Sequence, residues 1–234
     1  CFNESPLDEA RWTLKMVQDP ASKVVGVVAA IPVPEGAEAV DKFLAELRVD
    51  GALPAGLKGG RVPLLGDPLP APDTCRQVSY LDGLRVLAKT GLHWEFVCHW
   101  TALPHITEVC ASMPEMTFVL DHLGKNCGSP DDFEGWSKEV TALARRCPNV
   151  VAKLGAIEEW GYPDPAPCLD VALREFGMDR VLFESNWFAQ EAYGFDYGST
   201  VTAVWAALQR AGASSEQVDA VFSGNARRVY RLGL

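Results

Sequence analysis

Residues 118–125 have the sequence FVLDHLGK, an apolar run that ends in an acid, an imidazole, a hydrophobe and a glycine. The run has no polar face, so it predicts a strand buried on both sides, as in a parallel sheet. Alternation along a strand puts Asp121 and His122 on opposite faces, so one of them must face inward. We expect this to be His122, because an imidazole can bind a metal, transfer a proton or donate to a substrate oxygen.

The same alternation of buried strand and amphipathic helix continues along the chain. Strands are expected over residues 24–31, 56–64, 93–99, 117–124, 150–157 and 180–187. Helices are expected over residues 37–48, 79–90, 103–112, 132–146, 168–176 and 199–211. The strand starts recur every 24 to 37 residues, which is the length of a strand with its crossover helix. The run 24–31 is too apolar for a strand with one wet face and predicts burial on both sides.

Repeated β/α units form either an open doubly wound sheet or a closed barrel. No Gly-x-Gly-x-x-Gly follows any expected strand, and polar residues gather at the carboxyl ends of the strands. We therefore predict an α/β fold of the (β/α)₈ TIM-barrel type, in a single domain over residues 1–234. A closed barrel has eight strands and six are visible. Either two strands precede Cys1 and the barrel is incomplete at its N-terminus, or the sheet is open.

Composition limits the classes of partner. The 234 residues carry a formal net charge of −10 without a basic stripe, which argues against nucleic acid as a partner. The longest apolar run, over residues 24–34, is shorter than the roughly 20 residues of a membrane span. The seven cysteines are odd in number and form no Cys-x-x-Cys pair, which favours a cytoplasmic protein. We expect a small-molecule substrate, and exposed sheet edges would allow a homo-oligomer.

Two further groups of polar residues could carry chemistry. Glu184 shares a strand face with Asn186, and a buried carboxylate needs a cation, for which Lys153 on the preceding strand is the expected partner. Such a pair is either structural or functional, with mutually shifted pKa values. Arg61 ends a strand and could clamp a substrate carboxylate, and His99 on the next strand shares a face with a glutamate. His93 and His105 receive no role.

Four stretches of the chain together resemble one family. These are residues 118–125 (FVLDHLGK), 151–155 (VAKLG), 181–187 (VLFESNW) and 224–232 (GNARRVYRL). Their order and spacing are similar to those of the amidohydrolase-related family, the TIM-barrel hydrolases of the fuconolactonase and pyrone-dicarboxylate lactonase type. The resemblance implies a distorted barrel that opens small cyclic esters by attack of water, with the visible strands as numbers three to eight.

The resemblance also assigns residues. It implies that His122 contacts substrate or metal, that Arg61 contacts a substrate carboxylate or carbonyl, and that Lys153 is the lysine of the seventh strand. The family's His-x-His pair is missing, and Asn186 stands where the family has an aspartate that binds metal and acts as a base. An amide cannot take a proton from water, which weakens any zinc site and leaves His122 as the one metal candidate. Glu184 would then be the base, with Asn186 orienting water or substrate.

Three functions follow from this resemblance. The first is a hydrolase that opens a small lactone or a related cyclic carbonyl compound. The second is a decarboxylase that uses bound Zn²⁺ on the same scaffold, which would need three or four ligands at about 2.0–2.2 Å. The third is a non-catalytic or truncated member of the family, because a fold alone does not guarantee activity.

Overall fold

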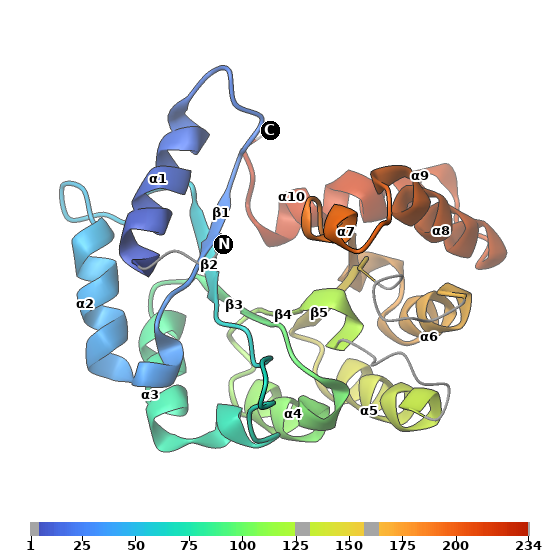
Figure 1. The fold of residues 1–234 in the computed structure, drawn as a ribbon, viewed down its shortest axis with the longest axis horizontal. Coiled ribbons are helices and arrows are strands. Elements are labelled where there is room, and N and C mark those ends of the chain that lie inside the picture. The colour runs from blue at the N-terminus through green and yellow to red at the C-terminus, as the bar shows by residue number, and fades with distance from the viewer. Residues whose placement is uncertain (1–4, 125–131, 157–163, 234) are drawn as a thin grey trace.

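Strands and helices alternate in the computed structural model, which describes residues 5–124, 132–156 and 164–233 (Figure 1). The strands are β1 (Val27–Ala29), β2 (Leu57–Arg61), β3 (His93–Phe96), β4 (Phe118–Leu120), β5 (Val150–Leu154) and β6 (Val181–Phe183). They form one parallel sheet in the order β1-β2-β3-β4-β5-β6. The predicted repeat of β/α units in barrel order is confirmed.

The helices fall into long crossover helices and short connecting turns. The α-helices are α1 (Pro6–Gln18), α2 (Ala37–Leu47), α3 (Val78–Ala88), α4 (Leu103–Ser112), α5 (Phe133–Arg146), α6 (Ala166–Phe176), α7 (Ala189–Ala192), α8 (Tyr197–Arg210), α9 (Ser215–Asp219) and α10 (Asn225–Val229). The short turns are η1 (Val33–Glu35), η2 (Thr74–Arg76), η3 (Trp100–Ala102), η4 (Asp121–Gly124), η7 (Met178–Arg180) and the π-helical η8 (Ala220–Gly224).

The sheet separates a large core from a small one. The crossover helices pack on its outer face, where α2 contacts α3, α4 contacts α5 and α5 contacts α6, and Figure 1 shows the sheet curving inside them. The large core lies between these helices and the sheet. A small cluster lies on the inner face, where side chains of β4, β5 and β6 meet the C-terminal helix α10 and the residue after it. Its members are Val119, Val151, Leu182, Ala226, Val229 and Tyr230.

The strands are shorter than predicted, and one prediction about burial is wrong. Val25 is 40% exposed and Val28 is half-buried, because β1 pairs only with β2 among the described residues and lies at an edge of the sheet. Strand β3 ends at Phe96 rather than at residue 99. Residue 157 of one predicted strand and Lys125 of the FVLDHLGK stretch lie outside the described residues. The predicted homo-oligomer and the single domain over 1–234 stay predictions.

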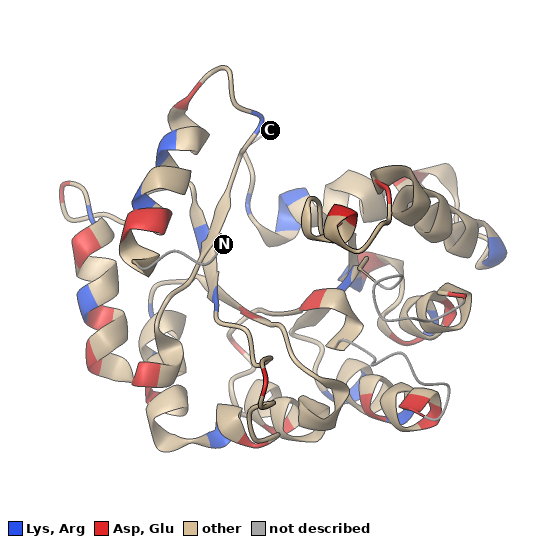
Figure 2. Cartoon of the chain, viewed as in Figure 1, with Lys and Arg blue, Asp and Glu red and all other residues tan. Residues whose placement is uncertain are grey.

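Four helices were not predicted, namely α1, α7, α9 and α10. Helix α1 has a local start signal, because Ser5 Oγ accepts a hydrogen bond from the Asp8 N–H and Pro6 opens the first turn. Figure 2 shows that acidic and basic residues are spread over the outer helices. Within the described residues, no helix has the length and apolar character needed to cross a bilayer. The cytoplasmic location stays a prediction.

Candidate functional site

Charged side chains follow the small inner core at the carboxyl ends of three strands. Val119, Val151 and Leu182 lie on the inner face, and side chains two positions later along a strand return to that face. These positions are Asp121, Lys153 and Glu184. Arg61, His122, Lys153, Glu184, Asn186 and Tyr230 are among the residues that line one pocket of about 440 Å³ at this end of the sheet.

Glu95 of β3 is the centre of the hydrogen-bond network below the pocket. Its side chain is fully buried, and Lys153 Nζ donates to Oε2 at 2.7 Å. Tyr230 donates its hydroxyl to Oε1 at 2.8 Å, and His93 Nε2 lies 3.2 Å from the same oxygen. Burial alone would raise the pKa of Glu95, but the cations Lys153 and Arg61 together with His93 hold the pKa well below its usual value. Glu95 is therefore an ionised anchor for Lys153 and Tyr230.

Asp121 shares the cations of Glu95. Lys153 Nζ lies 2.7 Å from Asp121 Oδ1, and Arg61 donates to Oδ2 at 2.9 Å. Burial, together with repulsion from Glu95, raises the pKa of Asp121, although Lys153 counteracts this. Burial would lower the pKa of Lys153, but the two carboxylates outweigh it and raise the pKa well above its usual value. The ammonium group thus stays charged between Glu95 and Asp121.

His122 and Glu184 form a second pair that lines the pocket. Glu184 Oε1 lies 2.6 Å from His122 Nδ1 and also accepts the His122 backbone N–H at 2.9 Å. Burial would lower the pKa of His122, but the Glu184 carboxylate outweighs it and raises the pKa above 6.5. Burial in turn would raise the pKa of Glu184, but His122 outweighs it and lowers the pKa. Among the described residues, no hydrogen bond engages Nε2 of His122.

The prediction that Lys153 forms an ion pair with Glu184 is wrong. Lys153 lies opposite Leu182 in the register of β5 and β6. Glu184 comes two residues after Leu182, so it lies closer than Lys153 to the carboxyl end of the sheet. Lys153 therefore reaches Asp121 on the other side, and His122 takes Glu184.

The prediction that only one of Asp121 and His122 faces inward is also wrong. The side chain of Asp121 points to the inner face of β4, as the alternation along the strand predicts. The backbone then leaves the strand conformation, because His122 and Leu123 both have φ values of 52°. This left-handed backbone turns the imidazole back toward the pocket. Both side chains consequently belong to the site.

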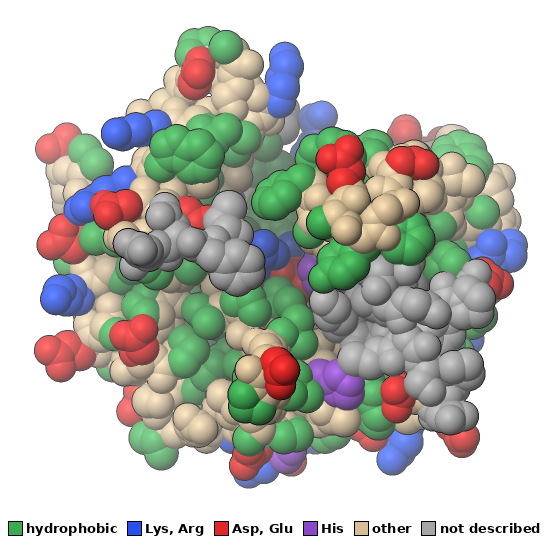
Figure 3. Space-filling view, in the orientation of Figure 1, with side chains coloured by type: hydrophobic (Ala, Val, Ile, Leu, Met, Phe, Trp, Pro, Cys, Tyr) green, Lys and Arg blue, Asp and Glu red, His purple; other side chains and the backbone are tan. Residues whose placement is uncertain are grey.

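The segment after β6 forms the mouth of the pocket. Asn186 lines it with a φ of 48°, a conformation that asparagine tolerates better than most residues. Trp187 also lines it and is 51% exposed. Figure 3 shows charged and His side chains together in the hollow beside the helical region that carries α7, with apolar groups along its rim. The mouth therefore combines an amide with an aromatic surface.

One predicted residue lies apart, and three residues of the network were missed. His99 follows the end of β3 and starts η3, where Nδ1 lies 2.9 Å from Thr101 Oγ1, and it does not line the pocket. The structure thus gives its predicted substrate-binding role no support. Glu95 and His93 could have been found from their spacing of two along one strand. Tyr230 lies in the stretch 224–232, but no local pattern links it to Glu95, which is 135 residues away in the chain.

The described side chains do not suit a resident metal ion. Within residues 5–124, 132–156 and 164–233, no group of three His, Cys, Asp or Glu side chains converges as metal ligands. The carboxylates of Glu95 and Asp121 already share Lys153, and Glu184 is held by His122. A metal ion at these carboxylates would have to displace the cations that they already hold.

Known proteins similar to this chain include two curated relatives. An uncharacterized protein of Sinorhizobium fredii, y4mH, is 28% identical over 167 residues, which are 69% of this chain and 54% of that protein. The L-fucono-1,5-lactonase of Burkholderia multivorans is 30% identical over 150 residues, which are 56% of this chain and 48% of the lactonase. The matches thus span about half the length of these relatives.

A solved structure and a family profile cover more of the chain. An amidohydrolase from Burkholderia multivorans, crystallised with bound zinc, superposes with a TM-score of 0.82 at 23% identity, over 96% of this chain and 79% of that one. This likeness shows the fold. The profile of the family described as Amidohydrolase matches residues 1–232. Because the match covers almost the whole sequence, the chain belongs to the amidohydrolase family.

Proposed function

We propose that the protein is a hydrolase that opens a small lactone by attack of water on the ring carbonyl. The observation that carries this proposal is the 2.6 Å contact between His122 Nδ1 and Glu184 in the wall of the pocket. A carboxylate on one ring nitrogen fixes the tautomer and stabilises the imidazolium, which leaves the other nitrogen to act as a base. The similarity to a lactonase over half its length supports the same reaction class.

The roles of the two residues differ from those that the sequence suggests. Glu184 accepts two hydrogen bonds from His122, and its lowered pKa makes it a weak base. His122 Nε2 would instead take the proton from water as the water oxygen bonds to the carbonyl carbon. The imidazolium would then return this proton to the ring oxygen as the ester bond breaks. The products balance as one hydroxycarboxylic acid from one lactone and one water.

The carbonyl oxygen gains negative charge in this step and needs donors. Arg61 lines the pocket and its side chain is 44% exposed, so its remaining N–H groups can reach a substrate. We assign Arg61 and the Asn186 amide to the carbonyl oxygen, where donors that are fixed in advance lower the barrier. Lys153 would act at longer range, since it already holds two carboxylates.

The charge balance of the site favours a neutral substrate. Glu95, Asp121 and Glu184 supply three carboxylates, against the cations Lys153 and Arg61 and a protonated His122. His93 lies beside Glu95 and does not line the pocket, so the described groups that face the pocket offer no surplus positive charge to a carboxylate on the substrate. Trp187 at the mouth offers a flat apolar face, on which a saturated six-membered ring can pack. We therefore propose an uncharged, hydroxylated lactone.

The test is a pH-indicator assay, which detects the acid released from a panel of neutral sugar lactones and carboxylated lactones. We expect hydrolysis of a neutral member and a loss of at least about 100-fold in kcat/KM for His122→Gln. His105→Gln is the matched control, because His105 lies on α4 outside the pocket. The proposal fails if the native chain opens no lactone above the buffer rate, or if the two variants have equal activity.

A further inference from the structure

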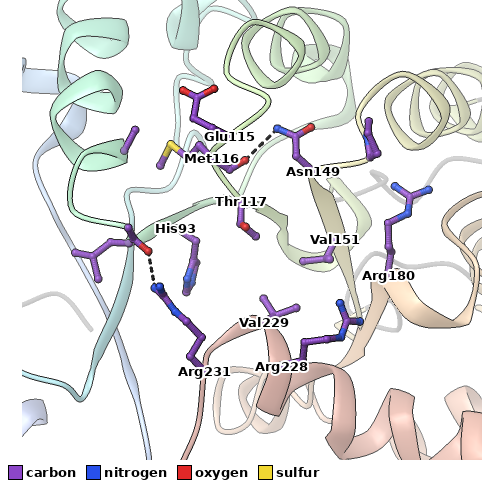
Figure 4. A pocket seen from close by; sticks show the side chains of 14 residues that line it. His93, Glu115, Met116, Thr117, Asn149, Val151, Arg180, Arg228, Val229 and Arg231 are labelled. Atoms are coloured by element: carbon purple, nitrogen blue, oxygen red, sulfur yellow. Dashed lines mark hydrogen bonds between the residues drawn. The ribbon is translucent and has the colours of Figure 1, made fainter.

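A second cavity lies at the opposite end of the sheet from the pocket described above. It has a volume of about 450 Å³ and is bordered by the N-terminal ends of β3 to β6 (Figure 4). Three arginines line it: Arg180 from η7, Arg228 from α10 and Arg231 from the segment that follows. Figure 4 shows Arg180 and Arg228 on one flank and Arg231 with His93 on the other.

Hydrogen bonds to oxygen atoms fix the orientation of these guanidinium groups. Arg180 donates to four carbonyl oxygens, those of Ala144 at 3.0 Å, Val150 at 3.2 Å, Cys147 at 3.3 Å and Glu175 at 3.4 Å. Arg228 donates to the Asp179 carbonyl and to Asn225 Oδ1, and Arg231 donates to the Gly91 carbonyl. A guanidinium has five N–H donors, so Arg228 and Arg231 keep donors for a ligand, whereas Arg180 uses four of its five on carbonyl oxygens and contributes mainly its charge.

The positive charge of this cavity has no counterpart in the described part of the protein. None of the three arginines forms an ion pair there, although the chain has 31 acidic residues against 21 basic ones. Glu175 lies close in sequence to Arg180, but its carboxylate is held by Arg145 and Arg174. Glu115 is exposed at the rim, and Figure 4 shows its carboxylate pointing away from the arginines.

Like charges that share a cavity repel one another unless an anion lies among them. The cavity is also lined by apolar side chains such as Leu92, Met116 and Val151 and by the polar Thr117 and Asn149, and its volume exceeds that of a bare phosphate ion. We propose that this cavity binds a phosphate group, free or on a small organic molecule, through Arg228 and Arg231 with Arg180 adding charge. Planar guanidinium forks pair with phosphate oxygens in a bidentate way, and several cations suit a dianion.

Isothermal titration calorimetry of the full chain at constant ionic strength tests this site with inorganic phosphate and with glycerol 3-phosphate. We expect saturable binding to the native protein and at least a tenfold rise in Kd for Arg228→Gln and for Arg231→Gln. Arg227→Gln is the matched control, since this arginine is exposed on the same helix and does not line the cavity. Tighter binding of glycerol 3-phosphate would indicate an organic phosphate, and equal or weaker binding would indicate free phosphate.

A second measurement needs no variant and covers the case in which a variant fails to fold. Phenylglyoxal modifies accessible arginines, and mass spectrometry locates the products. Phosphate should protect Arg228 and Arg231 and leave Arg227 reactive. The site is ruled out if neither probe binds saturably, if Arg227→Gln weakens binding as much as the other variants, or if protection does not distinguish the arginines. Neither measurement requires lactone turnover, so the result is independent of the proposed reaction.

Discussion

The imidazole of His122 is the residue whose protonation state should control the reaction. Its pKa lies above 6.5 because the nearby Glu184 carboxylate outweighs the effect of burial. A general base works only when deprotonated, so kcat/KM should rise with pH through a pKa above that value. Glu184→Gln removes the negative charge, and the midpoint of the profile should move to lower pH with a smaller limiting rate. A profile that stays flat or falls between pH 6 and 9 would contradict the assignment of His122 as the base.

Lys153 is the residue whose loss should destabilise the fold most within this network. Its ammonium lies 2.7 Å from both Glu95 and Asp121, and the side chain is only 12% exposed. Lys153→Met leaves two buried carboxylates with one fewer cation, which should cost about 3–5 kcal/mol in the free energy of unfolding. Urea denaturation measures this. Lys138→Met is the control, because that side chain is 80% exposed and should change stability by less than about 0.5 kcal/mol.

At the scale of elements, α10 ties the C-terminal end of the chain to the sheet. Asn225 donates from Nδ2 to the carbonyls of Met178 at 2.7 Å and Val181 at 2.8 Å. Asn225→Asp keeps the shape but removes both donors, so it should cost about 2 kcal/mol of stability. It should also lower kcat/KM, because Tyr230 follows this helix and holds Glu95. If Arg227→Gln on the same helix has equal effects, the loss belongs to the helix surface and not to this contact.

The order of the elements was predictable from sequence because the buried strands are continuous apolar runs that recur at a regular spacing. The charged positions at the ends of β4, β5 and β6 followed from alternation. What alternation cannot give is a change in backbone geometry, and the positive φ of His122 is such a change. The contact between Tyr230 and Glu95 joins distant parts of the chain, so no local pattern shows it. Whether a strand lies at the edge of a sheet also depends on its neighbours in space. The apolar run around Val25 therefore predicted burial on both sides, although β1 lies at the edge of the described sheet.

At the scale of the whole molecule, the network should make stability depend on pH. Glu184 has a lowered pKa, so its contribution is present above about pH 4.5 and is lost as the pH falls through the folded-state pKa. Asp121 has a raised pKa, so its protonation at low pH stabilises the fold and opposes the loss of the Glu184 contribution. His122 has a raised pKa, so its contribution is complete below 6.5 and is lost as the pH rises through the folded-state value.

The change in folding stability on the alkaline side therefore reports on His122. As the pH rises through the raised pKa of His122, the pair with Glu184 loses the imidazolium charge, and Lys153 and Arg61 then contact the carboxylates together with His93 beside Glu95. The thermal unfolding midpoint should fall as the pH rises above 6.5 in the native protein and fall less in His122→Gln. The formal net charge of −10 adds a general repulsion, which His105→Gln should leave unchanged as the control. If the unfolding midpoints of the native protein and of His122→Gln fall in parallel with pH, the imidazolium contributes nothing to folding. The general repulsion alone would then account for the slope.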